Sequence, residues 1–384
     1  MKYLLGKTPS ELKAITDELG LPKFAAKQIC DWLYKKKVST IDEMTNISKF
    51  ARQTLKEEYE VGHVKYVDKI ISEDGTKKYL FPVLLRGADN ENLAFANGQA
   101  PAPNKIADEE VPMNVEGSNI KSTHAPVEYM PRGIEVVMIP DRERATICVS
   151  SQVGCKMHCK FCMTGRQGYH GNLTAREIIS QFMEIDEHDR LTNAVFMGMG
   201  EPLDNYENVM RAIEILTSDW GFAWSPKRIT ISTIGVLPTL KRYLEESKCH
   251  LAVSLHNPFS DERLALMPAQ KAFPIDQVIA LIRQYDFTAQ RRVSFEYIML
   301  DGLTDSKQHA DALYRLLKGL ECRVNLIRFH KIPDSPFSPS PDAKIELFKK
   351  RLNNLGITTT IRASRGEDVM AACGMLAGKK VINN

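Results

Sequence analysis

The sequence predicts an α/β fold: an open (βα)6 partial TIM-type barrel with a small helical N-terminal domain and a β-hairpin linker region. Helical periodicity fills the first sixty residues, and alternating β-branched segments follow. From about residue 141, short strand patterns alternate with longer helical patterns. A chain of 384 residues, 43% apolar and 26% charged, is long enough to bury such a core.

The helical domain is expected over residues 1–60, as three short helices. The run Thr8-Pro9-Ser10-Glu11 starts the first helix and Gly20 ends it, while Pro22 starts the second. The third helix is predicted over residues 46–59. Apolar residues recur at helical spacing, so each helix has one face to bury. The resulting module is expected to be compact and helical.

A β linker region is expected over residues 61–140. Alternating segments occupy residues 61–85 around a turn at 72–76, and strand character resumes at 134–139. Residues 88–131 lack periodicity, are rich in Gly, Asn, Ala and Pro, and contain more acidic than basic side chains. We interpret them as a flexible acidic insertion into the hairpin.

The barrel is expected over residues 141–360, followed by a C-terminal catalytic loop at 361–384. Strands are predicted at residues 145–150, 193–197, 228–232, 250–255, 293–299 and 323–329. Helices are predicted at residues 175–187, 205–217, 237–246, 275–285, 306–318 and 342–355. Repeated strand–helix units make a parallel sheet, and six of them can curve into an open barrel. Its chemistry is expected at the carboxyl ends of the strands.

Composition limits the class of protein. No apolar run reaches the length of a membrane span and no signal peptide is recognisable, so we expect a cytoplasmic protein without a membrane partner. Eight cysteines are too few for a secreted disulfide scaffold, which favours metal ligands or catalytic thiols. The formal charge of +3 permits RNA binding without demonstrating it.

Three cysteines follow the first barrel strand at Cys-x3-Cys-x2-Cys spacing: Cys155, Cys159 and Cys162. Three thiolates can hold three corners of a [4Fe-4S] cluster and leave the fourth iron open for a small molecule. The alternative is a zinc site made by Cys159 and Cys162 with His158 or Cys148. Structural zinc usually takes four closed ligands, often from two separated pairs, and no second close cysteine pair occurs.

This loop, in a six-unit barrel, resembles that of the radical S-adenosylmethionine (SAM) enzymes. The glycine-rich run from Met197 to Pro202 also resembles theirs, which implies that it lies against the amino group of the cofactor. The segments around Cys148, Ser254 and Cys373 resemble the bacterial RlmN family more specifically, over nearly the whole chain. These enzymes methylate C2 of adenine in 23S ribosomal RNA and in some transfer RNAs. The resemblance therefore implies this activity and its two cofactors, a [4Fe-4S] cluster and SAM, with two SAM molecules per turnover. It also implies that residues 1–60 form a helix-hairpin-helix-like RNA-binding domain. It further implies an electron donor such as flavodoxin or ferredoxin, and we expect a monomer.

Three catalytic roles follow from the resemblance. Cys373 carries the methyl group as S-methylcysteine, Cys148 resolves the RNA adduct through a transient disulfide with Cys373, and Glu135 accepts a proton. Without the family resemblance, we would interpret Cys148 as a buried apolar residue and Cys373 as a thiol of the C-terminal tail. By strand alternation, Glu135 reads equally well as a solvent-facing residue.

The resemblance also carries over contacts to SAM. They are Gly200, Glu201, Ser232, Ser254, Leu255, His256 and Asn325. His256 is otherwise a satisfied core histidine and Asn325 a cap. Arg362 and Arg365, near the reactive cysteine, either hold RNA phosphates or belong to a solvated loop. The remaining cysteines, Cys30, Cys249 and Cys322, are interpreted as packing residues.

The sequence alone leaves two other functions open. One is the related methyltransferase that modifies C8 of the same adenine and confers antibiotic resistance. The long N-terminal portion and the barrel loops favour C2. The other is a non-enzymatic, zinc-stabilised RNA-binding module.

Overall fold

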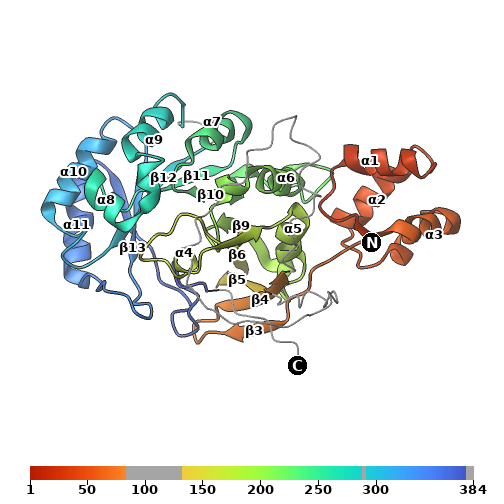
Figure 1. Ribbon diagram of the computed structural model, residues 1–384, viewed down its shortest axis with the longest axis horizontal. Helices are drawn as coiled ribbons and strands as arrows, with labels where there is room; N and C mark the ends of the chain where they lie inside the picture. The colour runs from red at the N-terminus through yellow and green to blue at the C-terminus, as the bar shows by residue number, and fades with distance from the viewer. Residues whose placement is uncertain (84–131, 288–290, 378–384) are drawn as a thin grey trace, which may run out of the picture.

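The computed structural model describes residues 1–83, 132–287 and 291–377 (Figure 1). The acidic insertion expected at residues 88–131 lies outside the described residues, and so does the end of the expected C-terminal loop, residues 378–384. The described chain forms an α/β barrel body, with the N-terminal module projecting from one side of it (Figure 1).

The N-terminal module combines short helices with a pair of short parallel strands. Its elements are β1 (Lys2–Tyr3), α1 (Pro9–Glu18), α2 (Ala25–Tyr34), η1 (Ile41–Glu43), α3 (Lys49–Glu58) and β2 (Tyr59–Glu60). Thr8 and Glu11 form a reciprocal capping box at the start of α1, where the sequence places the helix start. The Ser48 hydroxyl accepts a hydrogen bond from the Ala51 N–H and caps α3. This helix therefore begins after residue 46, where the sequence predicted its start.

One ten-stranded sheet forms the body of the molecule, in the order β14-β13-β12-β11-β10-β9-β6-β5-β4-β3. Six parallel strands correspond to the six predicted ones: β6 (Arg144–Cys148), β9 (Leu191–Phe196), β10 (Ile229–Thr233), β11 (His250–Ser254), β12 (Val293–Met299) and β13 (Arg323–Arg328). A seventh parallel strand, β14 (Thr358–Ile361), pairs with β13 at the edge and was not predicted. Its four residues are too short to show a clear period by themselves.

The expected linker strands continue this same sheet. They are β3 (Asp68–Ile71), β4 (Lys77–Val83) and β5 (Arg132–Asp141), all joined antiparallel. Strand β5 also pairs antiparallel with β6, which places Val137 opposite Cys148. The hairpin turn occurs where it was predicted, with the Ser72 N–H bonded to the Thr76 carbonyl. This hairpin turn gives the C-terminal loop a surface to pack against.

Helices follow the parallel strands and pack on the barrel. They are α5 (Ala175–Met183), α6 (Tyr206–Thr217), α7 (Leu237–Glu246), α9 (Ile275–Ile282), α10 (Lys307–Leu317) and α11 (Asp342–Asn354). Helix α5 ends four residues before the predicted 187. The chain turns there because Asp186 and Glu187 bind Lys69 and Lys77 of the hairpin. A further short helix, α8 (Ser260–Leu266), was not predicted.

Candidate active site and cofactor cavity

The three clustered cysteines lie on a loop at the carboxyl end of the barrel. The loop leaves the short strand β7 (Gln152–Gly154), carries Cys155, Cys159 and Cys162, and enters α4 (Met163–Arg166). The N–H of Cys162 donates to the carbonyl of Cys159 at 3.1 Å, which closes a tight turn between them. All three side chains line one cavity, which we call the cofactor cavity.

The setting of these thiols suits iron: Cys155 is buried, and Cys159 and Cys162 are half-buried. Burial raises the pKa of Cys155 to about 12 and also raises the pKa values of Cys159 and Cys162. A buried thiolate needs a bound cation, and iron–sulfur clusters take cysteine thiolates as ligands, so the three residues fit a [4Fe-4S] cluster. In the described part of the chain, no three His, Cys, Asp or Glu side chains are placed to hold a single metal ion. The zinc ligand sets considered above are therefore not assembled there.

Gly200 lines the cofactor cavity. Its position in the backbone accepts only glycine. Its φ of +101° is unfavourable for other residues, and a Cβ there would come within 2.5 Å of the Cβ of Gln152. The buried Gln152 amide holds the segment, since its Oε1 accepts from the Glu201 N–H at 2.8 Å. Its Nε2 donates to Asp204 at 2.7 Å. The glycine-rich run is therefore held rigidly against the cysteine loop.

Glu201 is fully buried beside the same cavity. Burial raises the pKa of its carboxyl to about 7, although the Thr233 hydroxyl and the N–H groups of Ile234 and Leu203 hydrogen-bond to it and oppose the rise. The Ile234 N–H donates at 3.0 Å and the Leu203 N–H at 3.2 Å. These bonds tie the end of β9 to the end of β10.

Three further predicted contacts line the cofactor cavity: Ser232, Ser254 and His256. His256 has a φ of +59° and its Nδ1 accepts from the Ile298 N–H at 3.1 Å. Burial, reinforced by Arg263, lowers the pKa of His256 to about 3, so the ring is neutral. Because Nδ1 accepts, the proton is on Nε2, which is then available as a donor.

Two predicted contacts do not line this cavity. Leu255 is buried in the core, and its carbonyl accepts from Arg263 Nε at 2.9 Å. Asn325 donates from Nδ2 to Glu296 Oε1 at 2.8 Å and accepts from the Thr360 hydroxyl at 2.8 Å. Their side chains therefore act on neighbours of the cavity. Asn325 in particular orients a carboxylate that does line it.

Cys373 lies where two hollows meet. It lines the cofactor cavity and also a second hollow, the thiol pocket, which it shares with Cys148, Met197, Arg362 and His330. Cys148 is buried near the end of β6, and burial raises its pKa to about 12. All eight cysteines lie in the described residues and are free, so the structure contains no Cys148–Cys373 disulfide.

Glu135 does not face solvent, which was the alternative that strand alternation left open for it. Glu135 is 4% exposed, and its Oε1 lies 3.0 Å from Nζ of the equally buried Lys78. Its Oε2 accepts from the Ala377 N–H at 2.7 Å, so it holds the C-terminal loop. Strand alternation failed because both faces of β5 are covered at this point. Glu135 lines neither the cofactor cavity nor the thiol pocket.

Sequence reasoning missed Glu296, and it placed Arg362 on an RNA-facing or solvated surface. Arg362 instead turns inward: its Nη1 lies 2.8 Å from the Met197 sulfur and 3.8 Å from Glu296 Oε2. Nearby Cys373 contributes most to raising the pKa of Arg362. Arg365 is partly exposed, 3.9 Å from Asp74. Only the strand register, which is not visible in the sequence, brings Glu296 to this cavity.

Sequence reasoning also missed Arg263, because the segment around it has the charged composition of a surface segment. It is fully buried and donates to the carbonyls of Leu255 and Ser254, at 2.9 and 3.0 Å. Burial lowers its pKa to about 10, so it remains charged at neutral pH. Arg263 therefore fixes the end of β11, where three of the predicted contacts lie.

The turn between β3 and β4 holds the loop that carries Cys373. The Ser72 hydroxyl donates to Asp368 Oδ1 at 2.5 Å, and the Glu73 N–H donates to its Oδ2 at 3.1 Å. From the other side, the Gly366 N–H donates to Asp74 Oδ2 at 3.1 Å. We call these three contacts the loop clamp.

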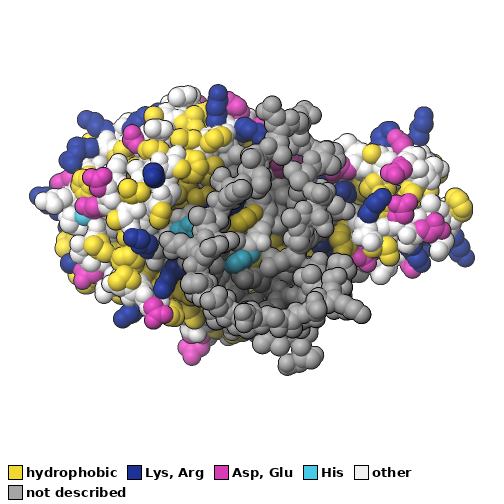
Figure 2. All heavy atoms as spheres, viewed as in Figure 1, with side chains coloured by type: hydrophobic (Ala, Val, Ile, Leu, Met, Phe, Trp, Pro, Cys, Tyr) yellow, Lys and Arg dark blue, Asp and Glu magenta, His cyan; other side chains and the backbone are white. Residues whose placement is uncertain are grey.

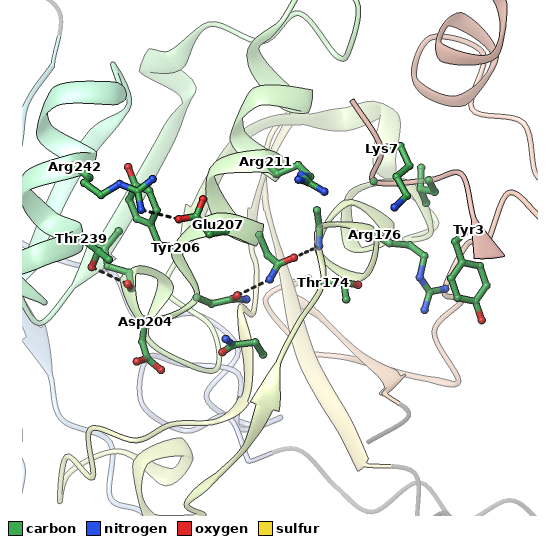
Figure 3. A pocket seen from close by; sticks show the side chains of 17 residues that line it. Tyr3, Lys7, Thr174, Arg176, Asp204, Tyr206, Glu207, Arg211, Thr239 and Arg242 are labelled. Carbon is green, nitrogen blue, oxygen red and sulfur yellow. Dashed lines mark hydrogen bonds and ion pairs between the residues drawn. The ribbon is translucent and has the colours of Figure 1, made fainter. Parts of the chain in front are cut away.

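A separate hollow lies between the N-terminal module and the barrel (Figure 3). Its arginines are engaged within the protein: Arg211 lies 2.7 Å from Glu11, and Arg242 lies 2.7 Å from Glu207. The Arg176 guanidinium stacks 3.8 Å from the Tyr3 ring centroid. None of the predicted site residues lines this hollow. The Arg211–Glu11 pair and the Arg176–Tyr3 stack join the module to the barrel.

Charged side chains of both signs are interspersed on the face shown in Figure 2. The charges on this face therefore do not form a surface of one sign. No described helix is long and apolar enough to cross a bilayer.

Two family models match the chain. The Radical SAM superfamily matches residues 149–313, and the ribosomal RNA large subunit methyltransferase N-terminal domain matches residues 3–61. The first match begins directly after Cys148 and includes the cysteine loop. The second covers the helical module.

Curated relatives match over the full length. The chain is 51% identical to the "Probable dual-specificity RNA methyltransferase RlmN" of Parabacteroides distasonis, covering 99% of this chain and 97% of the relative. It is 50% identical to the protein of the same name from Bacteroides thetaiotaomicron, covering 100% and 98%. Among solved structures, a radical SAM methyltransferase from Sphaerobacter thermophilus is 35% identical, with a TM-score of 0.81 and coverage of 98% of this chain and 99% of that one.

Proposed function

The chain belongs to the RlmN family of radical SAM RNA methyltransferases, and from this membership we propose that it methylates C2 of adenine in 23S ribosomal RNA and in a subset of transfer RNAs. The observation that carries the proposal is the position of Cys373. It lies between the cofactor cavity and the thiol pocket, so one side chain has access both to a bound cofactor and to Cys148.

We propose that Cys155, Cys159 and Cys162 hold a [4Fe-4S] cluster and that the cofactor cavity holds SAM. When bound, these groups supply a methyl group and, in a second event, a carbon-centred radical. Gly200, Glu201, Ser232, Ser254 and His256 line the cavity and orient the cofactor. Leu255 contributes through the β11 backbone and Asn325 through Glu296. Burial of this cavity keeps water away from reactive species.

Cys373 is the proposed methyl carrier. Adenine C2 is an electron-poor carbon whose hydrogen no ordinary side-chain base removes, so direct polar methylation is unfavourable. Carried on the sulfur of Cys373, the methyl carbon can be joined to C2 after losing a hydrogen atom. The protein and the RNA are then linked through this carbon, and the link has to be broken.

Cys148 is the proposed resolving thiol. Its thiolate attacks the sulfur of Cys373 and a disulfide forms, while the bond from the Cys373 sulfur to the carbon breaks. The electron pair of the broken bond goes to the carbon, which takes up a proton and becomes the methyl group. The one electron left over from the radical addition would be accepted by the bound [4Fe-4S] cluster. Both cysteines line the thiol pocket, which supports this pairing. The reaction also needs the C2 proton to be removed.

Glu135 is the proposed proton acceptor. In this structure both of its oxygens are engaged, one by Lys78 and one by the Ala377 N–H. We therefore propose that it takes the proton after movement of the C-terminal loop releases its Oε2. A low-potential donor such as flavodoxin or ferredoxin is proposed to supply electrons to the monomeric enzyme in the cytoplasm.

Nucleoside analysis of RNA tests this function. Ribosomal and transfer RNA from cells lacking the protein is digested and compared with RNA from cells complemented with the wild-type chain or with Cys373→Ala. We expect 2-methyladenosine only with the wild-type chain. Appearance of 8-methyladenosine in its place would show that the enzyme modifies C8.

A further inference from the structure

Four polar side chains form one row across neighbouring strands of the barrel. Ser254 on β11, Glu296 on β12, Asn325 on β13 and Thr360 on β14 are register partners in succession. Register partners in a sheet present their side chains on the same face. The Thr360 hydroxyl donates to Asn325, and Asn325 donates to Glu296 Oε1, both at 2.8 Å. The row therefore orients the carboxylate of Glu296.

Glu296 retains one carboxylate oxygen that accepts no hydrogen bond from the described part of the chain. The residue is 2% exposed, and its Oε1 accepts from Asn325 and from the Ser294 hydroxyl. Among the described residues its buried Oε2 has no hydrogen-bond partner, since Arg362 Nη1 lies 3.8 Å away. An unsatisfied buried acceptor is unfavourable, and such groups in native proteins usually have a ligand or a functional role. Glu296 lines the cofactor cavity, so a bound molecule can supply the missing donor.

We propose that Glu296 Oε2 accepts a hydrogen bond from a ribose hydroxyl of the cofactor, next to the Ser254 hydroxyl on the adjacent strand. The inference rests on the SAM site of the proposed function. Strand order favours the ribose over the amino group of the cofactor. The glycine-rich run follows β9, three strands from β12, and it is the segment expected to meet the amino group.

Charge supports the same choice of donor. The Arg362 guanidinium 3.8 Å away already offsets the negative charge of Glu296, so a neutral hydroxyl completes the site without adding a second cation. The two adjacent hydroxyls of a ribose also match the two polar side chains on adjacent strands, Ser254 and Glu296. Glu296 is then a specificity residue for a ribose with free hydroxyls.

Binding of S-adenosylhomocysteine and of its 2′-deoxy and 3′-deoxy forms tests the proposal on the anaerobically reconstituted full chain. Equilibrium dialysis measures affinity without any turnover. We expect wild-type protein to lose about tenfold or more in affinity when the hydroxyl that contacts Glu296 is removed, as for hydrogen bonds to charged groups. In Glu296→Ala, affinity for the parent compound should fall by a similar factor, and the difference between parent and deoxy forms should shrink to less than about threefold.

The matched control is Glu177→Gln, which alters another buried carboxylate that caps α5 outside the cavity. It should keep the wild-type preference for hydroxyls. Iron content and the circular dichroism spectrum are measured for every variant, and Glu296→Gln replaces Glu296→Ala if the alanine variant does not fold.

Three results would overturn the proposal. One is a folded, iron-loaded Glu296 variant that discriminates against the deoxy forms as strongly as wild type does. Another is wild-type protein that binds all three compounds equally. The third is a folded, iron-loaded Glu296→Ala variant whose affinity for S-adenosylhomocysteine equals that of wild type. Because no methylation is measured, a failure of the proposed RNA chemistry would leave this result unaffected, and the two failures can be told apart.

Discussion

The N–H of Met163 donates a hydrogen bond to the carbonyl oxygen of Gly374 at 2.8 Å. Met163 directly follows Cys162, and Gly374 directly follows Cys373. The Thr164 hydroxyl adds a second bond, to the Leu376 carbonyl at 2.7 Å. The loop of the proposed cluster ligands and the loop of the proposed methyl carrier are therefore held together by one backbone bond and one side-chain bond, and only the backbone bond survives changes of side chain.

The cysteine loop leads to a prediction about iron. Replacing Cys155, Cys159 or Cys162 with alanine should lower iron and sulfide content after anaerobic reconstitution and abolish methylation of both Cys373 and RNA, because a cluster held at two corners is labile. Colorimetric iron assays and mass spectrometry of the Cys373 peptide measure this. Cys249→Ala, a buried cysteine away from both cavities, should retain iron and activity. A cluster-ligand variant with full iron and full activity would contradict the assignment.

Replacing Cys373 and replacing Cys148 should differ in whether a covalent protein–RNA adduct accumulates. With Cys373→Ala no methyl carrier exists, so no protein–RNA adduct forms. With Cys148→Ala the carrier still reacts but the link is not resolved, and a covalent adduct should accumulate as a nuclease-sensitive shift on a denaturing gel. Cys249→Ala again serves as the control and should show normal turnover. An adduct in the Cys373 variant, or normal turnover in the Cys148 variant, would return Cys148 to a packing role.

The loop clamp predicts acid sensitivity. Burial raises the pKa of Asp74, but hydrogen bonds from Thr76, Gly366 and Ser72 outweigh it and lower the pKa from 3.8 to about 2. A depressed pKa stabilises the fold above the ordinary value, and this contribution is lost as pH falls from about 4 to 2. Asp74→Asn should therefore lower the free energy of unfolding at pH 7 by about 1–2 kcal/mol and narrow its gap to wild type as pH falls through this window.

Urea unfolding at pH 7 and at pH 3 measures the effect of Asp74→Asn. The exposed Asp219→Asn is the control and should change stability by less than about 0.5 kcal/mol at either pH. Equal destabilisation of the Asp74 variant at both values of pH would show that the carboxylate charge is not what stabilises the clamp.

The buried pair Lys78–Glu135 predicts strong coupling. Lys78→Met leaves a buried carboxylate without its cation and should lower the free energy of unfolding by about 3–5 kcal/mol. Adding Glu135→Gln should recover part of this loss, so the double variant is less destabilised than the sum of the singles. The half-exposed pair Lys2–Glu58 gives the comparison cycle, with coupling below about 1 kcal/mol. Additive effects at Lys78 and Glu135 would contradict a coupled pair.

Local signals in the sequence were enough to predict much of the barrel. The capping box of Thr8 and Glu11, the six parallel strands and the helices after them depend on periodicity and caps within about fifteen residues. The cysteine spacing depends on the same short range, and the structure brings Cys155, Cys159 and Cys162 to one cavity with five of the seven predicted cofactor contacts. The RlmN resemblance, which the comparisons confirm, supplied Cys148, Cys373 and those contacts.

What the tertiary structure alone decided involves pairing between distant segments. Strand β14 joins the sheet because β13 offers it an edge, and the C-terminal loop and Lys78 contact Glu135, which helps bury it where alternation allowed exposure. Glu296 and Arg362 meet across 3.8 Å although 65 positions separate them in the sequence. Sequence patterns report which residues share a face of one element, because that depends on backbone period. Which faces meet depends on strand register and long-range packing, and these become definite only when the whole sheet is assembled.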